Sequence, residues 1–229
     1  ISGGGRCNLT HHCFDPKELS SKYPRGAKEL RGAFHNWQPK DTIEWFETRG
    51  VKTKVEADGR MFPLTDDSQT VINCLRSEAR KHGISERLNS RVTALRQIDG
   101  QWEIQINGKE FLTTDKVCLV LGSLKQSGLE GILKELGHTI SPLLPSLFAF
   151  NLPSHPLKDL AGVAVQLAAV RTSPKSVAQV GPILITHRGL SGPAILRASA
   201  WDARELAKVN YQFTAEINWL GGNTPAQIR

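Results

Sequence analysis

The residues best suited to bind a ligand are the first eight of the chain, Ile1-Ser2-Gly3-Gly4-Gly5-Arg6-Cys7-Asn8. Three consecutive glycines let the backbone adopt positive φ angles and approach a ligand closely. Successive N–H groups of such a loop can surround a phosphate. Arg6 adds a planar guanidinium that suits a phosphate or a carboxylate, and Asn8 adds an amide that both donates and accepts hydrogen bonds. The stretch predicts a loop that holds an anionic or nucleotide-like cofactor; the alternative is a flexible glycine-rich end.

The cysteines and the histidines that follow do not predict a metal site. Cys7 and Cys13 are six residues apart with His11 and His12 between them, and no second pair of ligands accompanies them. Paired zinc ligands are usually two to four residues apart. No Cys-x-x-Cys pair occurs, so a thioredoxin-type site is not indicated either. We expect reduced thiols and no metal, and we interpret the two histidines either as proton donors near a cofactor or as polar loop residues.

The composition is that of a globular protein, with 39% hydrophobic and 22% charged residues. No apolar run is long enough for a membrane span. The net charge of +7 raises the question of nucleic acid, but Lys and Arg are scattered and form no block. We expect this charge to attract anionic cofactors and substrates. The predicted partner is a small-molecule substrate, and neither nucleic acid nor a membrane is expected. The predicted location is the cytoplasm, or a plastid if the source is photosynthetic.

The elements that must position the first eight residues begin with a run of helices. The predicted helices are Asp15–Ser21, Ala27–Ala33, 40–50 and 66–82, with a short strand at Val51–Val55. Asp15 and Asp41 are the expected N-caps of the first and third helices. Gly50 and Gly83 are expected to end the third and fourth helices, and Asp58-Gly59 predicts a turn between extended segments. Trp37 and Trp45 are expected in the core.

Residues 87–121 predict a β-meander followed by one buried strand. The meander strands are Arg87–Ala94, Trp102–Ile106 and Glu110–Leu112, with turn signals at Asp99-Gly100 and Asn107-Gly108. Lys116–Leu121 is an apolar run, as expected of a strand buried on both faces of a parallel sheet. It ends at Gly122, where such a strand would open onto a cofactor.

The remaining residues predict a helix and then a β-rich region. The helix is Leu129–Leu136, and the strands are Phe148–Leu152, Ala161–Val170, Gly181–Thr186 and Tyr211–Trp219. Ser191-Gly192-Pro193 predicts the start of another helix, with a cap followed by proline in the first turn.

Three motifs resemble one known family. Residues 2–8, followed by Leu9-Thr10, are similar to a signature of the YhiN-like (BaiN-type) flavoproteins, and residues 59–63 are similar to its Gly-Arg-x-Phe-Pro segment. The third motif is Thr186-His187-Arg188-Gly189-Leu190-Ser191-Gly192-Pro193. The resemblance implies an FAD-dependent oxidoreductase whose flavin is reduced by NAD(P)H. It also implies that a dinucleotide fingerprint precedes residue 1 and that a segment closing over the flavin follows residue 229 in the full-length protein.

The resemblance further implies the fold and the cofactor contacts. The expected fold is α/β: a partial glutathione-reductase-like FAD-binding domain with a β-meander at residues 1–143, and a β-rich insert domain at residues 144–229. The expected FAD contacts are Ser2, Gly3, Gly4, Gly5, Arg6, Cys7, Asn8, Val92 and Gly122. Arg60 either meets the cofactor or substrate or is a turn arginine paired with a carboxylate. No catalytic residue is singled out.

Three other functions stay open on the sequence. The first is a nonredox nucleotide-binding module that uses the same glycine loop. The second is a basic nucleic-acid-binding protein, and the third is an inactive part of such a flavoprotein. The substrate, the oligomeric state and the choice between NADH and NADPH are not fixed by these residues.

Overall fold

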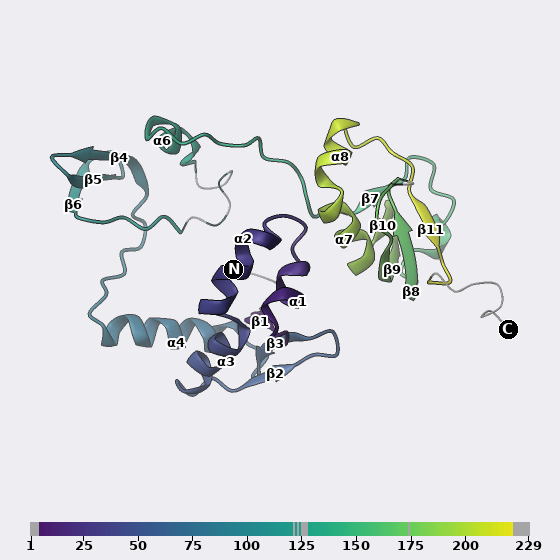
Figure 1. The fold of residues 1–229 in the computed structure, drawn as a ribbon, viewed down its shortest axis with the longest axis horizontal. Helices are drawn as coiled ribbons and strands as arrows, with labels where there is room; N and C mark the ends of the chain where they lie inside the picture. The colour runs from purple at the N-terminus through teal and green to yellow at the C-terminus, as the bar shows by residue number, and fades with distance from the viewer. Residues whose placement is uncertain (1–4, 121, 123, 125–127, 174, 222–229) are drawn as a thin grey trace. The chain divides into compact units, whose positions relative to one another are not determined.

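The structure is a computed structural model, and it describes residues 5–120, 122, 124, 128–173 and 175–221. The chain divides into two compact units, Ile1–Arg91 and Val92–Arg229, whose elements are labelled in Figure 1. The predicted boundary between residues 143 and 144 stays a prediction. Among the described residues, no helix has the length and apolar character needed to cross a membrane.

The first unit combines four helices with a small antiparallel sheet. The helices are α1 (Pro16–Ser21), α2 (Ala27–Asn36), α3 (Pro39–Glu47) and α4 (Ser68–Lys81). The sheet has the order β1-β3-β2, with β1 at Thr10–His11, β2 at Thr53–Val55 and β3 at Arg60–Pro63. A small cluster of buried apolar side chains joins α3, α4 and the sheet, formed by Phe46, Val51 and Val71.

The start of α3 corrects one prediction. Asp41 is not the N-cap; the N-cap is Gln38, three residues earlier, and Pro39 is the first residue of α3. The Asp41 carboxylate accepts the backbone N–H of Gln38 at 2.8 Å, as the third residue of the helix does in a capping box. Proline is favoured at the first helical position because its fixed φ suits a helix and its missing N–H is not needed there.

Glycine ends two helices of this unit as predicted. Gly50 has a φ of 84°, and the N–H of Val51 donates to the carbonyl of Phe46 at 3.0 Å. Gly83 has a φ of 65°, and the N–H of Ile84 donates to Ala79 in the same way at 2.9 Å. Both are the closing pattern of a Schellman motif, in which glycine occupies the left-handed position at no steric cost.

Helices α1 and α2 pack on each other as a helical hairpin. No residue of α2 is fully buried by this packing. Asp15 caps α1 as predicted, accepting the N–H of Glu18 at 2.6 Å. The prediction that Trp37 lies in the core is wrong, because its side chain is 54% exposed just beyond the end of α2. Trp45 is half-buried against the cluster around Phe46, as expected of a core residue.

The second unit begins with the predicted meander. Its antiparallel order is β4-β5-β6, at Val92–Ile98, Gln101–Ile106 and Glu110–Thr114. The first strand begins at Val92, not at Arg87. The Asp99-Gly100 turn, with φ angles of 49° and 84°, fixes the register so that Ile98 faces Gln101 and Val92 faces Ile106. Residues before Val92 therefore pass beyond the end of β5 and have no partner strand in this sheet.

The buried parallel strand predicted at Lys116–Leu121 is not observed. Residues 116–120 form no strand, and Val120 is 85% exposed; Leu121 lies outside the described residues. A strand buried on both faces needs neighbours on either side. Within the part of the chain that the structure describes, every strand pair is antiparallel and none includes these residues.

The rest of the second unit is built on a five-stranded antiparallel sheet in the order β11-β8-β9-β10-β7. The strands are β7 (Phe150–Asn151), β8 (Ala164–Arg171), β9 (Gln179–Thr186), β10 (Gly189–Ser191) and β11 (Glu216–Asn218). The helices of this unit are α6 (Glu130–Glu135), a 3₁₀ helix at Lys158–Leu160, α7 (Pro193–Trp201) and α8 (Ala203–Lys208). Helix α7 packs on the sheet, with Ile195 fully buried against Val170 and Ile183.

The predicted strands of this region are found in place, though β7 and β11 are shorter than expected. The predicted cap of α7 is wrong by one residue: Ser191 ends β10, and Gly192 precedes the helix.

Candidate functional site

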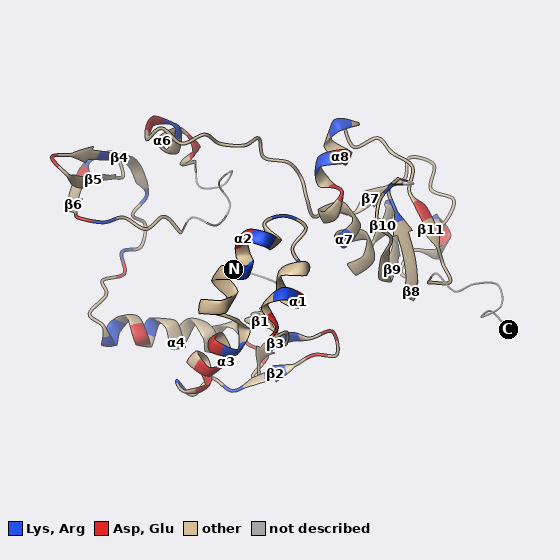
Figure 2. Cartoon of the chain, in the orientation of Figure 1, with Lys and Arg blue, Asp and Glu red and all other residues tan. Residues whose placement is uncertain are grey.

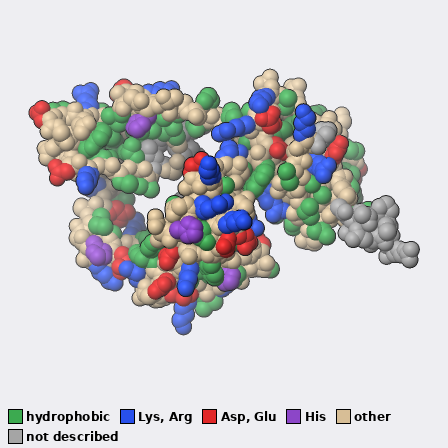
Figure 3. Space-filling model, in the orientation of Figure 1, with side chains coloured by type: hydrophobic (Ala, Val, Ile, Leu, Met, Phe, Trp, Pro, Cys, Tyr) green, Lys and Arg blue, Asp and Glu red, His purple; other side chains and the backbone are tan. Residues whose placement is uncertain are grey.

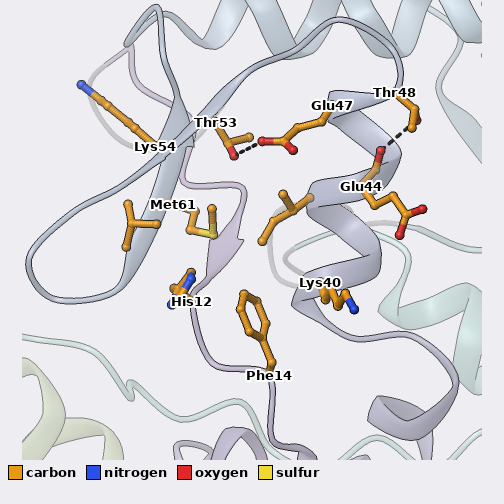
Figure 4. Close-up of a pocket in the computed structure, with 11 residues that line it drawn as sticks. His12, Phe14, Lys40, Glu44, Glu47, Thr48, Thr53, Lys54 and Met61 are labelled. Atoms are coloured by element: carbon orange, nitrogen blue, oxygen red, sulfur yellow. Dashed lines mark hydrogen bonds between the residues drawn. The ribbon is translucent and has the colours of Figure 1, made fainter.

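A groove of about 640 Å³ lies between α3 and the β2–β3 hairpin in the first unit. Figure 4 shows its lining, with side chains of α3 on one side and strand residues on the other. The lining residues are His12, Phe14, Lys40, Ile43, Glu44, Glu47, Thr48, Thr53, Lys54, Val55 and Met61. Every one of them comes from residues 12–61, so this short stretch of chain builds the whole groove.

The groove has an apolar floor and a charged rim. Met61 is 3% exposed, and Val55 and Ile43 extend the apolar surface beside it. Lys40 and Glu44 lie along the exposed side of α3. This combination of an apolar surface with a few charged groups suits a planar ring that carries polar atoms at its edge.

A hydrogen bond joins the two walls. The Thr53 hydroxyl on β2 donates to the Glu47 carboxylate on α3 at 2.8 Å, as Figure 4 shows. This bond links the helix to the hairpin at one end of the groove, so a contact within the protein sets the separation of the two walls there.

The two candidate histidines have different positions. The backbone N–H of His12 donates to Gly59 at 2.7 Å, and its ring, in the groove, packs edge-on against Phe14 with centroids 4.5 Å apart. The His11 ring lies instead over the hairpin turn, with Nε2 3.0 Å from the Asp58 carbonyl oxygen. A Cβ at Gly59 would lie only 2.5 Å from the His11 ring. Of the two, only His12 is placed to reach a ligand in the groove.

Arg6 is engaged within the protein. Its guanidinium forms ion pairs with Glu56 and with Asp66, the latter at 2.9 Å, and lies 4.0 Å above the Phe62 ring. The hydrogen bond to Glu56 raises the pKa of Arg6 above its ordinary value. A hydrogen bond from Lys54, with the charge of Arg6, lowers the pKa of Asp66. In this arrangement Arg6 ties the first residues to the β2–β3 hairpin, and its predicted contact with FAD stays a prediction.

The neighbours of Arg6 also hold the chain in place. The Gly5 carbonyl accepts the N–H of Ser68 at 2.7 Å, at the start of α4. Cys7 packs against the apolar cluster around Val71. The Asn8 side chain, turned so that its nitrogen faces β3, donates to the carbonyls of Met61 and Thr10 at 3.1 and 2.9 Å. Ser2, Gly3 and Gly4 lie outside the described residues.

Arg60, Val92 and Gly122, the other predicted ligand contacts, do not line the groove. Arg60 pairs with Asp58 across the turn at 2.7 Å, which is the arrangement of a turn arginine. Val92 is the first residue of β4 and is half-buried. Gly122 has a φ of 64°, with no atom near the position of a Cβ. The FAD contacts predicted for Val92 and Gly122 stay predictions.

The motif at residues 186–193 builds the sheet of the second unit. Gly189 lies where a Cβ would overlap the Phe150 carbonyl oxygen on β7, and a Cβ at Gly192 would lie 2.8 Å from the Pro182 carbonyl oxygen on β9. His187 is exposed in the turn between β9 and β10. Both glycines allow close backbone approach, so the motif is explained by packing.

Sequence reasoning missed most of the groove. Phe14, Lys40 and Glu47 carry no motif, and their chemistry emerges only when α3 packs beside the hairpin. The one available signal was the Gly-Arg-x-Phe-Pro segment: it places Met61 next to Phe62 on a strand, so that the two side chains face opposite sides of the sheet.

Comparison with known proteins supplies the remaining finding. A family model described as the HI0933-like protein Rossmann domain matches residues 1–218. The chain is 30% identical over 220 residues to the ribosomal RNA dihydrouridine synthase of Escherichia coli (strain K12), covering 92% of this chain and 53% of that protein. It is 29% identical over 239 residues to a 3-dehydro-bile acid delta(4,6)-reductase of Clostridium scindens, covering 100% of this chain and 56% of that protein.

A third relative is the ribosomal RNA dihydrouridine synthase of Haemophilus influenzae, 26% identical over 245 residues, covering 100% of this chain and 59% of that protein. The chain therefore spans about half the length of the curated relatives it matches.

Proposed function

The chain belongs to the HI0933-like Rossmann-domain family, and from this premise we propose that it forms part of a flavin-dependent oxidoreductase. Membership confirms the family resemblance predicted from the motifs and supports an α/β fold with a Rossmann-type domain. We propose in addition that residues 1–143 belong to a glutathione-reductase-like FAD-binding domain and that residues 144–229 form its β-rich insert domain.

The observation that carries the proposal is the family match over residues 1–218. Two relatives within it bear names that describe the same kind of chemistry on different molecules, the formation of dihydrouridine in RNA and the reduction of a bile acid. Both add hydrogen across a carbon–carbon double bond of a ring. We therefore propose that this protein reduces a carbon–carbon double bond in an unsaturated ring substrate.

The groove fits a flat ring better than it fits a pyrophosphate. Its apolar floor around Met61 and its rim with Lys40 match a planar heteroaromatic group with polar edge atoms. Arg6 does not fit a phosphate in the observed arrangement, because Glu56 and Asp66 already neutralise it. The proposal therefore assigns ring chemistry to the groove, and assigns the phosphates of FAD to backbone N–H groups of the glycine stretch.

When bound, reduced flavin supplies a hydride to one carbon of the double bond, and NAD(P)H is the proposed source of that hydride. The second carbon needs a proton, and His12 is the residue of this chain placed to give it. Its backbone is fixed by Gly59 and its ring by Phe14, and imidazole is suited to proton transfer near neutral pH. Lys40 on the rim favours negative charge that develops on a substrate oxygen conjugated with the bond.

The test is the visible absorption spectrum of the full-length protein, followed under anaerobic conditions while NADH or NADPH is added. Bound flavin that loses its oxidised absorbance with either nicotinamide supports the proposal. A full-length protein that binds no flavin even after FAD is added contradicts it. Flavin that binds but is reduced by neither nicotinamide favours the nonredox nucleotide-binding module.

A further inference from the structure

We propose that the α1–α2 helical hairpin is an RNA-binding surface that holds a single-stranded RNA beside the groove. The inference rests on the proposed function and deepens it by naming the surface that would hold the substrate. The choice of RNA over other polyanions follows the two relatives named as ribosomal RNA dihydrouridine synthases. The binding surface is defined here as Lys22, Tyr23, Arg25, Lys28, Arg31, His35, Trp37 and Lys40. It departs from the expectation, based on scattered basic residues, that nucleic acid is not a partner.

Positive charge gathers on this hairpin. Between residues 22 and 40 the sequence has five Lys and Arg against a single acid, Glu29, and so accounts for a large part of the net charge of +7. All five cations are exposed. Figure 2 shows Lys and Arg along α2, and Figure 3 shows several of their side chains together on the face in view.

Three of these cations are unpaired in the part of the chain that the structure describes. Within the residues that the structure describes, Lys28, Arg31 and Lys40 form no ion pair with a carboxylate. Other cations of this unit, among them Arg6 and Arg49, are each paired with a carboxylate. Exposed cations that form no ion pair are free to replace the counterions of a phosphate backbone.

Aromatic rings lie among the cations. Trp37 is 54% exposed and Tyr23 is 42% exposed. The indole N–H of Trp37 donates to the Thr42 hydroxyl at 2.9 Å, which fixes the orientation of the ring. The Tyr23 ring packs against the Phe34 ring of α2, with ring centroids 5.6 Å apart. Fixed, exposed rings between basic side chains are the arrangement on which the bases of a single strand stack.

The hairpin also adjoins the groove. The residues that flank it on either side, Phe14 before α1 and Lys40 after α2, both line the groove. Lys40 therefore belongs to the basic surface and to the groove rim. A strand held along α2 has one end at the groove, where an unstacked base can enter beside His12. Enzymes that modify a base inside RNA or DNA take that base out of its stack in this way.

The test is the binding of a fluorescently labelled single-stranded RNA oligonucleotide to the full-length protein, measured by anisotropy over a series of salt concentrations. The test variant is Lys28→Gln/Arg31→Gln. Each lost phosphate contact lowers affinity by about fivefold at 0.1 M salt and flattens the log–log salt slope by about 0.7. We expect about 25-fold weaker binding and a slope smaller by about 1.4. Trp37→Leu is expected to weaken binding by about fivefold or more, because stacking is lost.

The matched control is Lys109→Gln/Lys158→Gln, which removes the same charge from exposed sites in the second unit. Equal weakening by the control would show that only net charge matters and would overturn the proposal. So would wild-type protein that binds single-stranded DNA of the same sequence, or anionic lipid vesicles, as tightly as it binds RNA. The measurement needs no reductant, so failure of RNA binding and failure of flavin reduction are observed separately.

Discussion

Replacing Gly189 by alanine tests whether the motif at residues 186–193 serves the sheet. Gly189 has a φ of 149°, and an added Cβ would overlap the Phe150 carbonyl oxygen and lie 2.8 Å from Leu152 Cδ1 and 3.0 Å from Leu152 N. Two of these atoms belong to the backbone of β7 and the residue after it, so a side-chain rotation cannot relieve the overlap. Strand β7 must move away from β10.

The expected cost has two parts. A side chain forced into this region of φ costs about 1–3 kcal/mol. Moving β7 exposes Phe150, which is 5% exposed in the native structure, and a buried phenylalanine contributes about 1.5–3 kcal/mol. Gly189→Ala should therefore destabilise the sheet by about 2.5–6 kcal/mol, a large share of the stability of a typical domain.

Hydrogen exchange measured by mass spectrometry checks this locally. Peptides from β8 and β9 should exchange about 60-fold faster or more in Gly189→Ala, because about 2.5 kcal/mol corresponds to that factor. The control is Gly100→Ala, at a φ of 84° with no atom within 4 Å of the added Cβ. It introduces backbone strain of about 1–2 kcal/mol and no overlap. A change of less than about tenfold in β8 and β9 for Gly189→Ala would refute the reasoning.

Three further predictions follow from single contacts. His12→Gln should slow reduction of the substrate by about 100-fold in stopped-flow assays while NAD(P)H still reduces the flavin at the wild-type rate; His11→Gln should leave both rates nearly unchanged. The pKa of Asp66 is lowered in the folded protein, so its stabilising effect is present above its ordinary pKa and is lost as pH falls through the lower folded value. The urea midpoint should drop more steeply below about pH 4 in wild type than in Asp66→Asn. Ser199→Ala removes the hydroxyl that accepts the Phe148 N–H at 3.0 Å, which should cost about 1–3 kcal/mol by chemical denaturation; an unchanged midpoint would contradict this.

Local signals in the sequence predicted element ends well. Gly50 and Gly83 end α3 and α4, and Asp99-Gly100 turns the chain between β4 and β5. In each case the deciding physics is the conformational preference of one or two residues. Such preferences are present in the sequence itself and need no knowledge of the rest of the fold.

Predictions that depended on distant partners were less successful. An apolar run at 116–120 is compatible with a buried strand only where neighbouring strands flank it, and the described residues supply none. Trp37 is apolar and large, but no element covers it. The histidine pair shows the same limit at the site: the sequence offered His11 and His12 equally, and only the position of the Gly59 turn separates them.

The strand order of the second sheet has a consequence for synthesis on the ribosome. Among the described strands, β7, the first of the five to be made, pairs only with β10, and β11, the last to be made, pairs with β8. Strands β8 and β9 can form a hairpin as soon as both have emerged, but β7 must wait about 40 residues for its partner. During that interval Phe150 is exposed beside an unpaired strand. During translation of residues 150–190, this part of the nascent chain is therefore open to association with other chains or to capture by chaperones.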